Sequence, residues 1–459
     1  MENKEEQQRI AEENKKTIQK LFKLPIEYSK KIKTTKSMLT DLELIKTVNK
    51  DNVPIYNILF SPKTDLAHIC IDSWSKYYTN DIQFLKDSQN ILKNINDIPF
   101  EKDTIEDTYK SWNEIRNYAF FKEKFQYIEW DKILFLNKSP SFLMFLSFLN
   151  VSSPLMQLLA PVLMLIIPFL ALKIIGTRIT IETYIEMLKK VLKNNNVVQM
   201  ITNFSKVSMN QKMYILMTVG LYFYNLYQNF VSCRQFYRNA YYIIEKMNTI
   251  KNYLEYTINK IKVFSTRINT YETYGPFLND LCEYEIKLTR LYEYFKYMPK
   301  KCTSFSTLKC FGNIMRDFYN IYDEEEWNNT MMYSFGFNGY IDNLIGLREN
   351  IVTNKINSVE FTKRNKFKFY DTYHPSLLDK PTKNNIDLKK SIILTGPNAA
   401  GKTTMLKSTI INLLFSQQFG YGYYRKGVLN PYDFIHCYIN IPDDCSRDSL
   451  FQSEVRRCK

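Results

Sequence analysis

Glycine and histidine are scarce in this sequence of 459 residues, which contains 12 glycines and 3 histidines. Its 8 cysteines are scattered, and no two of them form a Cys-x-x-Cys pair. This spacing is not that of a zinc site, so we expect reduced thiols in a cytosolic or nuclear setting. The N-terminal stretch is densely charged and lacks the apolar core of a signal peptide, which argues against secretion by that route.

Apolar residues and positive charge, by contrast, are abundant. A hydrophobic content of 45% can supply several cores, and the length predicts roughly two to four domains. The formal net charge of +15 favours anionic partners, either nucleic acid or an acidic membrane surface. A lysine-rich, AT-biased genome would give a similar excess with no function attached, and both interpretations stay open.

Changes in composition divide the chain into a series of segments. The first is a charged arm, expected to be a solvated helix or disordered, and the second and fourth have the apolar spacing of packed helices. The last alternates apolar and polar residues, most clearly at Lys366–Tyr370, which predicts strands of an α/β domain. The segments are residues 1–35, 36–138, 139–233, 234–354 and 355–459.

The third segment is hydrophobic. Residues 139 to 172 contain no charged side chain, and Leu155 to Ile175 is long enough to span a bilayer, with prolines that would kink it. Met213 to Cys233 is a weaker second candidate, and lysines and arginines on both sides leave the orientation undetermined. The alternative is that both stretches are buried helices of an α-helical core. We expect a membrane-associated protein with its C-terminal domain in the cytosol, the alternative being a soluble protein of the nucleus or cytoplasm.

One stretch carries a chemical motif, the run Gly396, Pro397, Asn398, Ala399, Ala400, Gly401, Lys402, Thr403, Thr404. It matches the pattern G-x-x-x-x-G-K-[ST], in which backbone amides wrap phosphates, the lysine reaches the β and γ oxygens and the hydroxyl binds Mg²⁺. Ser391 to Leu394 is predicted as a buried strand of a parallel sheet and Met405 to Phe415 as a helix. The sequence therefore predicts a mainly α-helical protein followed by a partial α/β P-loop domain that binds ATP and Mg²⁺.

The order of motifs around this loop resembles the ATPase domain of the MutS mismatch-repair family. The matching pieces are His374-Pro375, the strand-like Asn384–Leu388, Gly396-Pro397-Asn398 and the acidic segment Asp443–Glu454. The two helical segments resemble the family's lever. The resemblance implies that Asn398 acts near the γ phosphate, that His374 and its neighbour Tyr373 lie near the adenine, and that Ser449 reaches across a dimer to the partner's nucleotide.

Several residues depart from the family pattern. Ala399-Ala400 replaces the usual Met-Gly, and Leu450 stands where a threonine is expected, which weakens the prediction for Ser449. No mismatch-reading domain is evident before residue 36, so DNA binding would be non-specific. No apolar strand ending in Asp-Glu precedes Lys459, so we assign no catalytic residue. Either a truncated or split gene leaves the missing half to another chain, or the protein binds nucleotide without hydrolysing it, and both interpretations stay open. A dimer through the ATPase domain, or a complementing chain, is the expected partner.

Two other functional interpretations stay open. The chain is either a MutS-like ATP-binding protein, a non-hydrolysing structural or remnant protein, or an ABC-type P-loop ATPase of other function. The loop follows nearly 400 residues of mainly helical pattern, and no glycine-rich signature comes after it, which argues against the ABC type.

Overall fold

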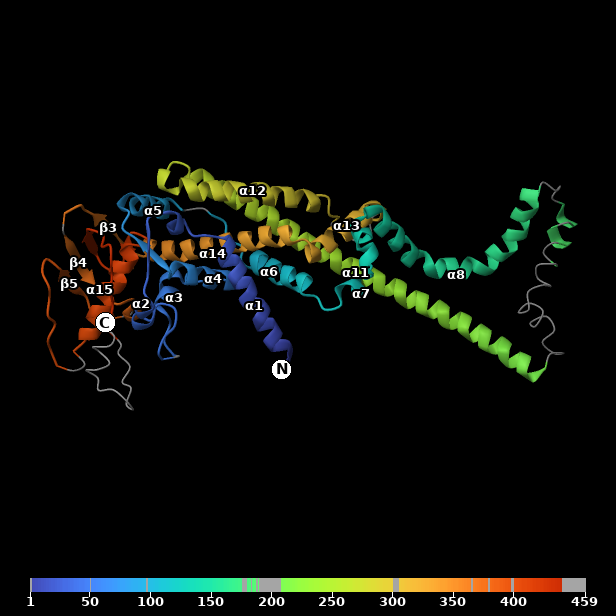
Figure 1. Ribbon diagram of the computed structural model, residues 1–459, viewed down its shortest axis with the longest axis horizontal. Coiled ribbons are helices and arrows are strands. Elements are labelled where there is room, and N and C mark those ends of the chain that lie inside the picture. Colours follow the sequence, from blue (N-terminus) through green and yellow to red (C-terminus); the bar gives the residue numbers. More distant parts are fainter. Residues whose placement is uncertain are drawn as a thin grey trace. The chain divides into compact units, whose positions relative to one another are not determined.

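The computed structural model describes residues 2–49, 51–95, 98–175, 180–182, 184–186, 189, 208–299, 305–364, 366–378, 380–397 and 400–439. Over these residues the fold is mostly helical with a small mixed sheet near the C-terminus, as the sequence predicts (Figure 1). Contacts divide the chain into two compact units, each assembled from segments far apart in sequence. Unit 1 comprises Met1–Glu114, Thr249–Lys296 and Glu324–Lys459, and unit 2 comprises Ile115–Asn248 and Tyr297–Asp323.

Unit 1 is built around one buried helix, α14. Its residues from Thr330 to Leu347 are almost all buried, and the helices α1, α3, α4 and α12 pack against it. Glycines at the crossings allow close approach of neighbouring backbones. The helices of this unit are α1 (Glu2–Leu21), α2 (Lys36–Asp41), α3 (Ile55–Phe60), α4 (Asp65–Trp74), α5 (Ile82–Asn94), α6 (Lys102–Arg116), α12 (Gly275–Phe295), α14 (Glu325–Val352), α15 (Lys402–Ser416) and the last part of α11 (Met209–Ile268), with single turns η1 (Pro25–Tyr28), η4 (Glu272–Tyr274) and η5 (Pro375–Leu377).

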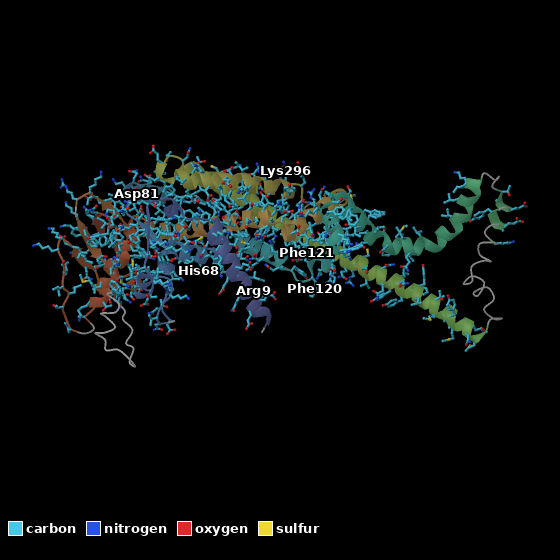
Figure 2. The ribbon with its side chains drawn as sticks, in the orientation of Figure 1. Arg9, His68, Asp81, Phe120, Phe121 and Lys296 are labelled. Atoms are coloured by element: carbon cyan, nitrogen blue, oxygen red, sulfur yellow. The ribbon has the colours of Figure 1, made fainter. Side chains whose placement is uncertain are left out.

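Side-chain caps define where several of these helices begin. The carboxylate of Asp81 accepts hydrogen bonds from the backbone N–H groups of Gln83 (3.0 Å) and Phe84 (3.1 Å) at the start of α5 (Figure 2). The hydroxyl of Thr64 does the same for Ala67 in α4. Each cap satisfies a donor that has no acceptor inside the helix, so the caps fix the starts of these two helices.

Residues 1–35 contain the helix α1, whose first part is exposed as expected, but the segment is not solvated throughout. Ile18 and Phe22 are buried, and the Phe22 ring lies 5.3 Å from the Tyr333 ring and 6.1 Å from the Phe277 ring. The segment is charged overall, but Ile18 and Phe22 are four residues apart and therefore share one helix face. A narrow apolar stripe of this kind is enough to pack α1 against the rest of unit 1. The charged average composition of the segment does not reveal such a stripe.

The sheet of unit 1 has five strands in the order β5-β4-β7-β3-β6. β3 and β7 are parallel, and the other neighbouring pairs are antiparallel. The strands predicted around Lys366–Tyr370 and Asn384–Leu388 are confirmed as β4 and β5. The strands are β3 (Asn357–Phe361), β4 (Phe367–Thr372), β5 (Asn384–Asp387), β6 (Tyr421–Gly422) and β7 (Lys426–Leu429), and a separate antiparallel pair is formed by β1 (Lys31–Lys33) and β2 (Tyr77–Thr79).

The prediction of a buried strand at Ser391–Leu394 is wrong. These residues are in no strand, and the Ile393 side chain is 89% exposed. An apolar run becomes a buried strand only where it gains strand neighbours and a covered face. Among the described residues, the sheet runs from β5 to β6, and Ser391–Leu394 pairs with none of its strands.

Unit 2 is centred on an aromatic cluster. The ring of Phe121 stacks on that of Tyr322 at 4.2 Å and lies 5.5 Å from Tyr127, whose hydroxyl donates to the carbonyl of Met315. The neighbouring Phe120 is 79% exposed (Figure 2). The elements of this unit are α7 (Phe121–Phe125), η2 (Asp131–Lys138), α8 (Pro140–Ile175), the first part of α11 and α13 (Phe305–Asp323).

The hydrophobic segment forms α8, a continuous helix that is curved in Figure 1 and passes through Pro154, Pro161 and Pro168. Within the described residues, one stretch, Pro140–Leu159, is long and apolar enough to cross a bilayer by length and composition, and 11% of it is buried. The alternative of a buried core helix does not fit this stretch. The second candidate, Met213–Cys233, lies in α11 and is less apolar than this test requires, although its Met213 and Leu216 side chains are also exposed.

Candidate nucleotide-binding site

The predicted phosphate loop leads directly into helix α15. Gly401 precedes the helix with a φ of 82°, in the left-handed region that favours glycine. The first bond of the helix runs from the N–H of Met405 to the Gly401 carbonyl at 2.9 Å. The N–H groups of the residues between them, Lys402 to Thr404, have no acceptor within the helix, and such groups attract anions.

The side chain of Lys402 folds back over the loop. Its ammonium donates to the carbonyl oxygens of Gly396 and Pro397, the second at 2.7 Å. A Cβ added at Gly396 would be in ordinary van der Waals contact with Lys402 and Ala400, at 3.8 and 3.9 Å. The loop therefore gathers one ammonium and a helix N-terminus, two kinds of group that bind phosphate.

The structure brings together most of the predicted site residues. Gly396, Pro397, Ala400, Gly401, Lys402, Thr403 and Thr404 are described, and the last two are exposed at the start of α15. Asn398, Ala399 and Ser449 lie outside the described residues, as does the acidic segment Asp443–Glu454. Over the described ranges, no three His, Cys, Asp or Glu side chains are grouped to hold a metal ion. The role of Thr403 as a Mg²⁺ ligand stays a prediction from the motif.

His374 lies beside α15, at the end of the segment that follows β4. Its Nδ1 accepts the N–H of Ser376 at 3.3 Å, so the ring caps η5. Burial, reinforced by the nearby Lys407 ammonium, lowers the pKa of His374 to about 4. The imidazole is therefore neutral at physiological pH. Lys407, on α15, forms an ion pair with Glu43 at 3.0 Å.

Tyr373, which the resemblance places near the adenine together with His374, is already engaged. Its hydroxyl donates to the carbonyl of Lys355 at 2.6 Å, and its ring makes an edge contact with Tyr423. The structure therefore assigns Tyr373 to local packing, while the role of His374 near a base stays a prediction.

Asn412 was missed by the sequence analysis. This fully buried residue of α15 donates to the Thr372 hydroxyl (3.0 Å) and the Tyr373 carbonyl (3.1 Å), and it accepts the N–H of Tyr423 (2.6 Å). Asn412 therefore links α15 to the segment that carries His374. The available signal is an amide within the apolar run Ile411–Phe415, and such a residue needs buried partners.

Two glutamines hold the far end of α15. The Gln417 amide donates to the Thr79 carbonyl at 3.0 Å, and the Gln418 amide donates to the carbonyls of Trp74 and Tyr77. Asn412 and the two glutamines therefore fix the C-terminal half of α15, the helix that follows the loop. Helical rigidity of this kind holds a binding site in place.

Replacing Asn412 with alanine is expected to destabilise the protein by about 2–3 kcal/mol, because several buried groups lose their partners. Denaturant unfolding measures this difference. Asn90→Ala is the matched control, since Asn90 is exposed on α5, and it should change stability little. An Asn412 variant as stable as the Asn90 variant would contradict the view that these hydrogen bonds stabilise the fold.

Comparison with protein-family models finds no match for this chain, and a search of curated proteins finds none either.

Proposed function

We propose that this chain binds ATP with Mg²⁺ at residues 396–404, in a partial α/β P-loop domain of MutS-like type. The observation that carries the proposal is the geometry at the start of α15, where left-handed Gly401 sets the helix N-terminus beside the ammonium of Lys402. Phosphate groups bind where a helix N-terminus and a lysine ammonium lie close together.

Each residue has a separate part in the proposed site. The ammonium of Lys402 exchanges its carbonyl acceptors for β and γ phosphate oxygens, and the N–H groups of the first turn of α15 bind the same phosphates. Thr403 supplies a hydroxyl to Mg²⁺, which neutralises phosphate charge when bound. The neutral ring of His374 faces the base without repelling or attracting charge. Asn398 and Ser449 keep the roles that the resemblance implies.

The proposal includes membrane association with the nucleotide site in the cytosol. It is supported by the exposed apolar surface of α8, of which the stretch Pro140–Leu159 is only 11% buried. Apolar patches of that extent on a protein surface mark interaction with a membrane or a partner. A second ATPase domain or a complementing chain remains the proposed partner at the nucleotide site.

Retention of labelled ATP on filters tests the site. Lys402→Ala should weaken binding by about 10- to 100-fold, because a charge-assisted phosphate contact contributes about 1.5–3 kcal/mol. Lys390→Ala removes an exposed lysine a few residues before the loop and should bind like the wild type. Equal retention by the Lys402 and Lys390 variants would refute the phosphate role.

A further inference from the structure

We infer that residues 213–233 of α11 and the facing part of α8 cross a lipid bilayer as an antiparallel pair, with Arg234 and Lys212 marking the two membrane surfaces. This inference rests on the membrane association proposed above. It adds which residues enter the bilayer and where the entry stops.

The contacts between the two helices set their register. The Cys233 thiol lies against the Val151 carbonyl, the Asn229 amide donates to the Gln157 side chain, and the Tyr222 hydroxyl donates to the Gln157 carbonyl at 3.2 Å. Positions rise along α8 as they fall along α11, so the helices are antiparallel. Both extend away from the rest of unit 2 (Figure 1).

Residues 213–233 contain no charged side chain and are bracketed by Lys212 and Arg234. At 1.5 Å per residue this stretch is about 31 Å long, which matches the roughly 30 Å hydrocarbon core of a bilayer. The uncharged stretch of α8 runs from residue 139 to residue 172, and Val151 and Gln157, which contact α11, lie inside it. Both helices are therefore uncharged where they meet.

Apolar side chains are exposed around both helices and not along one stripe. On α11, Leu216, Phe223 and Phe230 are each more than 60% exposed, and successive exposed positions such as Met213, Tyr214, Leu216 and Met217 point in different directions at 100° per residue. A protein partner would cover one face of such a helix. A bilayer surrounds it, so lipid is the occupant that this distribution favours.

Several polar groups of the pair are satisfied within it. Asn229 and Tyr222 of α11 each bond Gln157 of α8, and the hydroxyls of Ser147 and Thr218 return to carbonyls four residues earlier in their own helices. Inside a bilayer such pairing is required, because no water is present to replace it. The amides of Asn225 and Gln228 are exposed on α11, and they are outnumbered by the apolar side chains around them.

Beyond Arg234, α11 carries the kinds of side chain that are common at the headgroup layer of a membrane. Arg238 is exposed, and so are the aromatic rings of Tyr237 and Tyr241. Basic side chains and tyrosines are enriched at this level of membrane proteins because each has an apolar stem and a polar tip. The boundary at Arg234 is therefore marked by charge and by aromatic residues together.

Flotation with vesicles of phosphatidylcholine and phosphatidylglycerol, followed by carbonate extraction, tests the inference on the full chain. The wild type should float and resist extraction, and Phe223→Lys, at the centre of the stretch, should lower the floated fraction about tenfold or more. Tyr241→Lys makes the same kind of change past the boundary on the same helix and should float like the wild type. A wild type that stays in the soluble fraction, or two variants that behave alike, would overturn the inference.

Additional experiments distinguish membrane binding from nucleic-acid binding and from the proposed nucleotide site. Nuclease treatment should leave flotation unchanged, and sedimentation that depends on added duplex DNA in place of vesicles would identify this surface as a nucleic-acid site and overturn the inference. Lys402→Ala should float like the wild type, whereas Phe223→Lys should retain ATP on filters. A wild type that retains ATP but does not float contradicts only the membrane pair, and a wild type that floats but does not retain ATP contradicts only the proposed nucleotide site.

Discussion

Replacing Gly346 with alanine is expected to destabilise unit 1 by about 3 kcal/mol, at the upper end of the cost of overpacking a core. Gly346 lies in the buried helix α14, where α3 crosses it. A Cβ at this position would lie 1.5 Å from the carbonyl oxygen of Phe60 and 2.5 Å from its carbon. These are backbone atoms, so no side-chain rotation relieves the contact. The two helices must move apart, and the packing around Gly346 is lost.

Guanidinium unfolding of the two proteins measures this effect. Gly220→Ala is the control, since Gly220 lies inside helix α11 and a Cβ there meets nothing within 4 Å. Alanine is the better helix former by about 1 kcal/mol, so the control should be neutral or slightly stabilised. A Gly346 variant with the stability of the wild type would show that α3 and α14 do not cross as described.

Stability is expected to rise by about 2 kcal/mol from about pH 7 to about pH 9 because of one lysine. Lys260, on α11, is buried at 1% exposure; its ammonium donates to the Asn338 side chain at 2.9 Å and lies 4.1 Å from the Tyr256 ring centre and 5.5 Å from that of Phe100. Burial lowers the pKa of Lys260 from its usual 10.5 to about 7, and the charges of Asp342 and Glu101 offset only part of that.

The sign follows from proton binding in the two states. Below about pH 7 Lys260 is protonated in both the folded and the unfolded chain, so it gives no slope. Above that pH the folded chain releases this proton while the unfolded chain keeps it up to about pH 10, and the unfolded state then binds more protons. Stability therefore increases with pH. Burial also raises the pKa of the Cys70 thiol, which offsets a small part of this rise near pH 9. It raises the pKa of Tyr253 and Tyr256 too, which lowers stability only near and above pH 10.

Unfolding of wild type, Lys260→Met and Lys262→Met across this pH range checks the prediction. The methionine at position 260 should abolish the rise. Lys262 is exposed on the same helix, and its variant should keep the rise of the wild type. A Lys260 variant that still gains stability between pH 7 and pH 9 would assign the effect to other groups.

Sequence periodicity predicted the helices and strands whose formation depends mainly on neighbouring residues. The apolar spacing of Met405–Phe415 predicted α15, and the alternation at Lys366–Tyr370 predicted β4, because periodicity alone distinguishes a helix from a strand. The phosphate-loop motif was likewise visible, since glycine spacing and a following lysine are local features. Gly401 takes a left-handed conformation, which glycine adopts readily.

The errors and omissions share a cause in distant contacts. Ser391–Leu394 has the composition of a buried strand, but a strand also needs neighbours, and no single-sequence pattern supplies them. Asn412 and Lys260 look like ordinary polar residues until α15 meets β4 and α11 meets α14. Phe22 looked solvated because its partners, Tyr333 and Phe277, come hundreds of residues later.

Hydrogen exchange of the backbone amides, with and without Mg²⁺ and ATP, tests the central claim most directly. The proposed site predicts slower exchange at residues 396–404, where the loop and the first turn of α15 present N–H groups to phosphate. Exchange in β4 and β5 should change much less, because their N–H groups are already bonded within the sheet. Protection confined to other parts of the chain, or no protection at saturating ATP, would contradict nucleotide binding at this loop.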